Sequence, residues 1–127
     1  MAKILIAEDE PDIRNLITFT LRFAGHEVID TDNGIELLDK IQEMAQNGEL
    51  PDLILMDVRM PRMTGYEACE RIKADEALKS VPVAFLSAKG QEAEVQTGLD
   101  AGAIAYIVKP FSPDELTENV AALLSES

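Results

Sequence analysis

The sequence is poor in cysteine and contains no long apolar run. With one cysteine, Cys69, among 127 residues, the chain can form no internal disulfide, and no second cysteine suggests a zinc site. No segment approaches the roughly 18 consecutive apolar residues that a membrane span requires. The N-terminus passes straight into Ile4-Leu5-Ile6 without the apolar core of a signal peptide. We therefore expect a cytoplasmic protein that is not in the membrane, with Cys69 packed inside a helix.

Positive charge is scarce as well. The chain carries 11 Lys and Arg side chains against 24 Asp and Glu side chains, a formal net charge of −13 at pH 7. Such a field repels phosphate backbones and anionic lipid, so we expect no direct nucleic-acid partner and no membrane partner. The 46% of apolar residues is enough to build the core of one domain. We expect a single domain over residues 1–127, with no output domain in this chain.

Five short apolar segments predict β-strands. Those at 3–7, 52–57 and 81–86 lack the polar and apolar alternation of a half-exposed strand, which is typical of strands buried on both faces. Weaker segments at 27–31 and 105–108 complete the set.

Helical patterns separate these strands. Apolar residues recur at helical spacing in 13–24, 37–45 and 116–124. Pro11 suits the first position of a helix, Thr64 with Glu67 forms a capping box, and residues 112–115 combine a cap, a proline and a second capping box. Strand and helix therefore alternate five times, which predicts an α/β fold: a doubly wound, five-stranded parallel sheet with five helices covering both faces.

Polar residues lie at the carboxyl ends of the predicted strands, which is where functional sites occur in such sheets. Ligands bind outside the carboxyl ends of the strands, near the point where the strand order reverses. The residues at these ends are Glu8 and Asp9 on the first strand, Asp57 on the third, Ser87 on the fourth and Lys109 on the fifth. Each alone is more often a cap, a turn former or a surface residue. Together, at four strand ends, they predict a functional site.

The chemistry of this site follows from its carboxylates. If the first and third strands are neighbours, Glu8 and Asp9 face Asp57, and carboxylates packed so closely repel unless a hard divalent cation lies among them. Mg²⁺ is the expected cofactor because it accepts one or two carboxylates, retained waters and a phosphate oxygen, with Mn²⁺ as the alternative. A carboxylate can attack phosphorus when charge on the transferred oxygens is offset, here by the metal, Lys109 and Ser87. We therefore predict that Asp57 takes up a phosphoryl group.

Four motifs follow one another along nearly the whole chain. They are Ile4-Leu5-Ile6-Ala7-Glu8-Asp9-Glu10, Asp57-Val58-Arg59-Met60-Pro61-Arg62-Met63-Thr64-Gly65, Leu86-Ser87-Ala88-Lys89, and Ala101-Gly102-Ala103 leading to Tyr106-Ile107-Val108-Lys109-Pro110-Phe111. In this order and spacing they make the chain resemble a response-regulator receiver domain, the phosphoacceptor module of two-component signalling. The resemblance implies a flavodoxin-like three-layer sandwich with strand order 2-1-3-4-5.

The resemblance also implies a role for each matching acidic or basic residue. Asp57 is the implied phosphoacceptor. Asp9 and Asp57 are the implied direct Mg²⁺ ligands, Glu8 acts through water, and Arg59 contributes its backbone carbonyl. Lys109 pairs with Asp57 or with the phosphoryl oxygens. Glu8 stands where Asp is more frequent in the family, which is a conservative departure.

Further implied roles concern switching and lifetime. Ser87, where Thr is more frequent, is the switch hydroxyl that follows the phosphoryl group, and Tyr106 is the aromatic that swings inward when Ser87 moves. The Lys109-Pro110 bond is cis in the family. Arg59 and Lys89 lie two positions after the acceptor and the switch hydroxyl, and long cationic side chains there can block the approach of the hydrolytic water. We therefore expect a long-lived aspartyl phosphate.

The resemblance implies partners as well. A sensor histidine kinase or a histidine phosphotransfer protein donates the phosphoryl group, a downstream protein target reads it, and a phosphorylation-dependent homodimer is the expected mode of any self-association. Such a protein is not a conventional enzyme: we expect self-phosphorylation from small phosphodonors and slow autodephosphorylation. His26, in the turn after the first helix, lies far from the acidic edge and is not expected to be a competing phosphosite.

Other functions fit the sequence less well. A nucleotide- or flavin-binding domain needs glycines after the first strand to cradle phosphate, and this turn is Glu8-Asp9-Glu10-Pro11. A Mg-dependent phosphatase with an aspartyl nucleophile, of the haloacid-dehalogenase type, needs a second Asp two residues after the first, where Arg59 stands, and a cap domain; it is a distant alternative. A complete single-domain regulator and a receiver fragment of a larger regulator or hybrid kinase both remain open.

Overall fold

Strands and helices alternate along the chain, as predicted. The computed structural model describes residues 2–88 and 95–125. Its strands are β1 Lys3–Ala7, β2 Glu27–Thr31, β3 Leu53–Asp57, β4 Val83–Ala88 and β5 Ala105–Lys109. Its helices are α1 Pro11–Phe23, α2 Gly34–Gln46, α3 Gly65–Ala74, α4 Val95–Asp100 and α5 Pro113–Ser125.

The strands form one parallel sheet in the order β2-β1-β3-β4-β5. Strand β1 pairs with β2 on one side and with β3 on the other, so the strand order reverses beside β1. Strands β4 and β5 extend the sheet in the same direction beyond β3. This is the doubly wound order that the resemblance implies, and it places the carboxyl ends of β1 and β3 next to each other.

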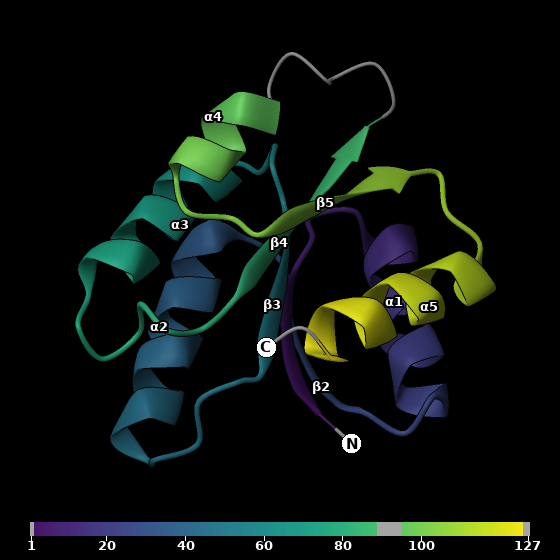
Figure 1. Ribbon diagram of the computed structural model, residues 1–127, viewed down its shortest axis with the longest axis horizontal. Helices are drawn as coiled ribbons and strands as arrows, with labels where there is room; N and C mark the ends of the chain where they lie inside the picture. The colour runs from purple at the N-terminus through teal and green to yellow at the C-terminus, as the bar shows by residue number, and fades with distance from the viewer. Residues whose placement is uncertain (1, 89–94, 126–127) are drawn as a thin grey trace.

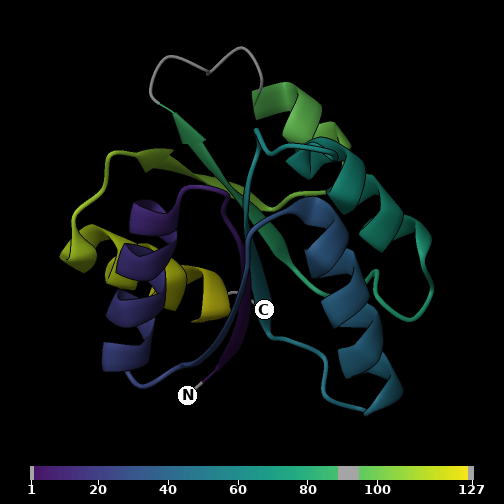
Figure 2. The same cartoon turned by 180° about the vertical axis from the view of Figure 1, so that it is seen from behind.

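Helices cover both faces of this sheet. Figures 1 and 2 show α1 and α5 on one side and α2, α3 and α4 on the other. Alternate strand residues feed two separate cores: Leu5 and Ile54 pack toward α2 and α3, whereas Ile4 and Leu55 pack toward α1 and α5. Every residue of β3 is buried, which explains why its sequence is continuously apolar up to Asp57.

Helix starts are fixed by the predicted caps. Pro11 begins α1. The Thr64 hydroxyl accepts a hydrogen bond from the Glu67 backbone N–H at 3.2 Å, and the Glu67 carboxylate accepts one from the Thr64 N–H at 3.1 Å. Ser112 and Glu115 make the same reciprocal pair before α5. Each cap satisfies backbone donors that have no partner within the helix, which stabilises the start by about 1 kcal/mol.

Strand boundaries differ from the predicted ones by one or two residues. The fourth strand was expected at 81–86 but runs Val83–Ala88, because Pro82 has no N–H to donate to a sheet ladder. Its carbonyl still accepts from the Ile54 N–H at 2.9 Å. The fifth strand continues one residue past 108 to Lys109, which pairs with Ala88. Ser87 therefore lies within its strand and not at the end.

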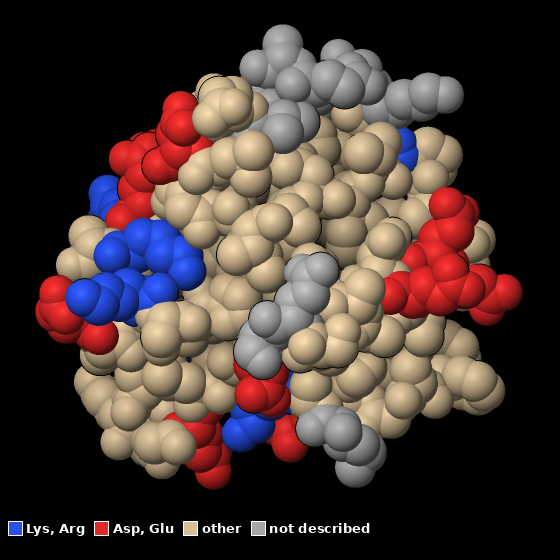
Figure 3. Space-filling model, viewed as in Figure 1, with Lys and Arg blue, Asp and Glu red and all other residues tan. Residues whose placement is uncertain are grey.

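The surface carries the charge that the composition predicts, in an uneven pattern. In Figure 3, Lys and Arg side chains form a patch on the side of α3, whose last turn contains Arg71 and Lys73, with acidic side chains around it. Another acidic group lies toward α5, whose first turn contains Asp114 and Glu115. No helix in the described part of the chain is both long and apolar enough to span a bilayer. Cys69 is buried in α3 as expected, and burial raises its pKa to about 11.

Candidate functional site

Charged residues lie at the carboxyl ends of three strands, along one edge of the sheet. Strand β1 ends at Ala7 and is followed at once by Glu8 and Asp9, while Asp57 is the last residue of β3 and Lys109 the last of β5. Because Ala7 pairs with Met56 in the β1–β3 ladder, the residues just beyond them emerge side by side. The topology therefore brings together groups that lie up to 101 positions apart in sequence.

The carboxylates of Glu8, Asp9 and Asp57 form a tight cluster. One oxygen from each side chain lies within 4.8 Å of the others, and among the residues that the structure describes this is the group suited to hold a cation. Glu8 is fully buried, Asp57 is nearly so, and Asp9 is exposed. The cluster thus opens to solvent on the Asp9 side and is closed on the Glu8 side.

Lys109 links two members of this cluster. Its Nζ donates to Glu8 Oε1 at 2.7 Å and to Asp57 Oδ2 at 3.1 Å. The side chain reaches Asp57 across β4, which separates β5 from β3. The other Asp57 oxygen, Oδ1, accepts from the Arg59 backbone N–H at 3.2 Å. Both Asp57 oxygens are therefore held by nitrogen donors.

The cluster is short of positive charge. Burial raises the pKa of the Glu8 carboxyl from its usual 4.5 to about 7; the hydrogen bond from Lys109 opposes this rise and the neighbouring Asp57 adds to it. Burial would lower the pKa of Lys109, but hydrogen bonds and attraction to Glu8 and Asp57 outweigh it and raise that pKa. One ammonium group does not compensate three carboxylates.

These residues fit a hard divalent cation. The donors are carboxylate oxygens, which Mg²⁺ prefers, and the exposed Asp9 leaves room for the waters and phosphate oxygen that Mg²⁺ retains. A dication beside Glu8 would favour its ionised form and supply the charge that Lys109 alone does not. Glu8, Asp9 and Asp57 are the side chains that would hold it.

The turn after β1 and the loop after β3 are held by backbone contacts. Arg14 Nη1 donates to the Glu8 carbonyl at 3.0 Å, and the Glu10 N–H donates to Glu8 Oε2 at 3.2 Å. After β3, the Gly65 N–H donates to the Val58 carbonyl at 2.8 Å. A Cβ on Gly65 would collide with the Asp57 carbonyl oxygen, so only glycine allows α3 to start this close to the acidic edge.

Ser87 and Tyr106 lie in the neighbouring strands β4 and β5. Asp57 pairs with Leu86 in the β3–β4 ladder, which places the buried Ser87 just beyond Asp57. Tyr106 pairs with Phe85 in the β4–β5 ladder, and their ring centroids are 5.5 Å apart. Since Phe85 and Ser87 point to the same face of β4, Tyr106 lies on the Ser87 side of the sheet.

The remaining predicted positions fall in three different places. The Lys109–Pro110 peptide bond is cis, as the resemblance implies. The Arg59 side chain is exposed directly after the acidic edge. Lys89 lies outside the described residues.

Sequence reasoning did not single out Phe85 or Gly98, which pack around Tyr106. For Gly98, the available signal was an isolated glycine inside a helical segment.

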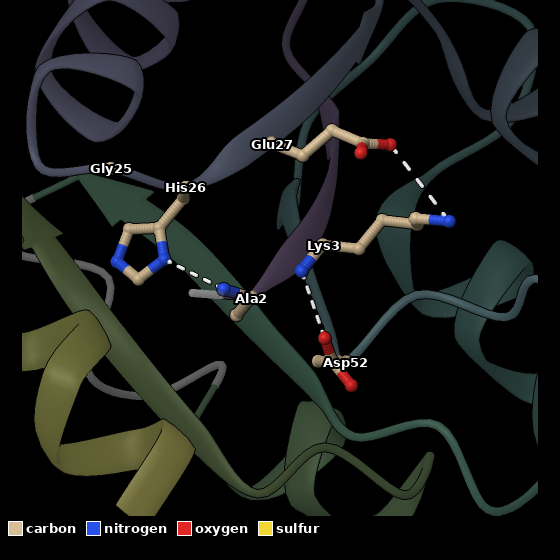
Figure 4. Close-up of a pocket in the computed structure, with 6 residues that line it drawn as sticks. All are labelled: Ala2, Lys3, Gly25, His26, Glu27 and Asp52. Carbon is tan, nitrogen blue, oxygen red and sulfur yellow. Dashed lines mark hydrogen bonds and ion pairs between the residues drawn. The ribbon is translucent and has the colours of Figure 1, made fainter.

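His26 lies at the opposite end of the sheet, as predicted. It directly precedes β2, and its Nδ1 accepts from the Ala2 N–H at 3.2 Å. Figure 4 shows it in the same pocket as Lys3, the first residue of β1, and Asp52, which directly precedes β3. The same pocket contains a hydrogen bond from the Lys3 N–H to Asp52 Oδ2 at 2.8 Å. His26 is thus a structural loop residue remote from the acidic cluster.

Known proteins share both this sequence and this fold. The family model of the response regulator receiver domain matches residues 4–121. The chain belongs to this family. The receiver domain is 40% identical over 121 residues to the phosphate regulon transcriptional regulatory protein PhoB of Pseudomonas aeruginosa, covering 95% of this chain and 51% of PhoB. It spans about half the length of the curated relatives it matches.

Solved receiver structures superpose closely on this one. Chemotaxis response regulator CheY4 of Vibrio cholerae has a TM-score of 0.88 at 33% identity, covering 97% of this chain and 98% of CheY4. The receiver domain of the Pseudomonas aeruginosa sensor histidine kinase PA1611 has a TM-score of 0.83 at 31% identity, with 98% of each chain covered. That structure contains a magnesium ion coordinated in its active-site cleft. The comparisons give no support to the phosphatase alternative.

Proposed function

We propose that this receiver domain accepts a phosphoryl group on Asp57 from a phosphohistidine of a sensor histidine kinase or histidine phosphotransfer protein. The observation that carries the proposal is the placement of Asp57 at a strand end, within 4.8 Å of two further carboxylate donors and in contact with Lys109. In the transfer, an Asp57 oxygen forms a bond to phosphorus as the phosphorus–nitrogen bond breaks, and the leaving imidazole nitrogen takes a proton.

Residues of this chain orient the Asp57 carboxylate and offset the negative charge of the transferred group. The Arg59 N–H and the Lys109 ammonium hold the two Asp57 oxygens, so the carboxylate is fixed before a donor arrives. Lys109 offsets charge on the transferred oxygens. Asp9, Asp57 and the Arg59 carbonyl would hold Mg²⁺ directly and Glu8 would act through water; the cation would supply the remaining positive charge, with Mn²⁺ as the alternative.

The response to phosphorylation passes through Ser87 and Tyr106. Ser87 is buried one residue beyond Leu86, the ladder partner of Asp57, and from there its hydroxyl can follow a new phosphoryl oxygen. Tyr106 lies in the neighbouring strand on the same face, half-buried, and follows Ser87 inward. Arg59 and Lys89 set the lifetime of the aspartyl phosphate by covering the approach of the hydrolytic water.

Partners and context complete the proposal. The chain acts in the cytoplasm on a protein target, makes no direct contact with nucleic acid, and self-associates only when phosphorylated. PhoB is a transcriptional regulator of about twice this length, and the PA1611 domain is part of a histidine kinase. Both a single-domain regulator and a receiver fragment of a larger regulator or hybrid kinase are consistent with the proposed chemistry.

Labelling tests the acceptor. Incubation with acetyl phosphate and Mg²⁺ should add one acid-stable, base-labile phosphoryl group, detected as a mass increase of the intact protein. Asp57→Asn should remove the group, and EDTA should prevent its addition. Asp52→Asn is the matched control, because Asp52 also borders β3 but at its amino end. Equal labelling of Asp57→Asn and wild type would refute the assignment.

A further inference from the structure

The ring of Tyr106 belongs to an aromatic cluster between the sheet and the helices on one face. Phe85 is fully buried at the centre of the cluster. Tyr66 from α3 packs edge-on against it, with ring centroids 5.3 Å apart and planes at 82°, and Tyr106 packs on it at 5.5 Å and 48°. The position of Tyr106 is therefore set by Phe85 beneath it and by whatever covers its hydroxyl end.

Gly98 of α4 covers that end. A Cβ placed on Gly98 would collide with the Tyr106 hydroxyl oxygen, and it would lie 2.7 Å from Tyr106 Cζ and 2.9 Å from Phe85 Cδ2. Contacts this short force something to move. No side chain larger than hydrogen therefore fits at position 98 while Tyr106 stays in its present place.

The backbone itself does not call for glycine here. Gly98 lies within α4 and, unlike Gly102, has no positive φ. Glycine is the weakest helix former other than proline, so its presence inside a six-residue helix lowers the stability of that helix. The space that it leaves for Tyr106 is the feature of the structure that accounts for it.

We propose that Gly98 is a positioning residue that leaves the space in which the hydroxyl end of Tyr106 lies, here called the Tyr106 seat, and that its size decides whether Tyr106 can respond to the phosphoryl group. The second half of this inference rests on the proposed function. A residue with a Cβ at position 98 would displace Tyr106 from this space whatever the state of Asp57. Phosphoryl uptake, which occurs at the strand ends, would continue.

Aromatic NMR tests the seat directly. In a Tyr66→Phe background the remaining tyrosine signals belong to Tyr106, because the chain has two tyrosines. Gly98→Ala should abolish the nuclear Overhauser contacts between the Tyr106 and Phe85 rings, whereas the matched α4 substitution Thr97→Ala, at an exposed position, should keep them. Retention of these contacts in Gly98→Ala would overturn the proposal.

A thermal-unfolding cycle separates the collision from a general defect in α4. Gly98→Ala should lower the Tm when Tyr106 is present. In a Tyr106→Ala background the same substitution should raise the Tm, because the collision is gone and alanine favours the helix. A decrease of equal size in both backgrounds would show that position 98 does not act through Tyr106.

NMR spectra recorded with beryllofluoride and Mg²⁺ then test the role of Gly98 separately from the proposed phosphoryl uptake on Asp57. In wild type, both the amides around Asp57 and the Tyr106 ring should shift; in Gly98→Ala the amides should shift and the ring should not. Equal ring shifts in the two proteins would overturn the coupling role of Gly98. If the amides around Asp57 fail to respond in wild type, the proposed function fails, while the ring contacts and the Tm cycle still decide the seat.

Discussion

Glu8 should make the metal-free protein less stable as pH rises. Its carboxyl is fully buried, and its pKa rises from 4.5 to about 7 on folding. A carboxyl that binds its proton more tightly in the folded chain contributes stability below the unfolded pKa and loses it as pH rises through the folded pKa. The loss should therefore develop between about pH 4.5 and pH 7 and be complete above that range.

The size of this effect follows from the same two values. Each unit of pKa corresponds to about 1.4 kcal/mol, so a rise from 4.5 to about 7 makes ionised Glu8 cost about 3 kcal/mol of the free energy of unfolding. Glu8→Gln removes this dependence because the amide stays neutral and can still accept from Lys109. Relative to wild type, the variant should gain about 2.5 kcal/mol between pH 5 and pH 8.5, since part of the loss has already occurred at pH 5.

Urea unfolding in EDTA, followed by circular dichroism at several pH values, measures this difference. Glu10→Gln is the matched control, since Glu10 is an exposed carboxylate two positions away, and it should follow wild type. His26, whose pKa is lowered by burial, is present in every variant, so its contribution cancels. Added Mg²⁺ should stabilise wild type more than Glu8→Gln. Parallel wild-type and Glu8→Gln profiles would refute the reasoning.

Three further outcomes are expected. Ser87→Ala and Lys109→Ala should still accept phosphate on Asp57 at some rate but show a weaker conformational response, measured as amide shifts with and without beryllofluoride; a full response in Ser87→Ala would remove that hydroxyl from the switch. Arg59→Asn, Lys89→Glu and the double variant should lose the phosphoryl group faster at fixed Mg²⁺, and unchanged or slower decay in all three would show that neither side chain shields it. Thr64→Ala should lower the free energy of unfolding by about 1 kcal/mol in a urea titration, because α3 loses its N-terminal cap, and no change would show that the capping box is not stabilising.

The sequence alone determined the order of elements and the candidate residues. Runs such as Leu53 to Met56 indicate strands buried on both faces, and a capping pair such as Thr64 and Glu67 marks a helix start, because both signals depend on residues close together in the chain. Parallel strands share one carboxyl edge, so Glu8, Asp57 and Lys109 could be grouped without coordinates. The sequence could not place the strand boundaries around Pro82, where hydrogen-bond geometry decides.

Only the tertiary structure decided the energetics of the site and the seat of Tyr106. The full burial of Glu8, and hence its raised pKa, comes from packing of the whole edge, and the reach of Lys109 across β4 to Asp57 depends on strand order. The contact of Gly98 with Tyr106 likewise depends on how α4 lies on the sheet. Desolvation and steric exclusion act over a few ångströms between segments distant in sequence, so local patterns do not report them.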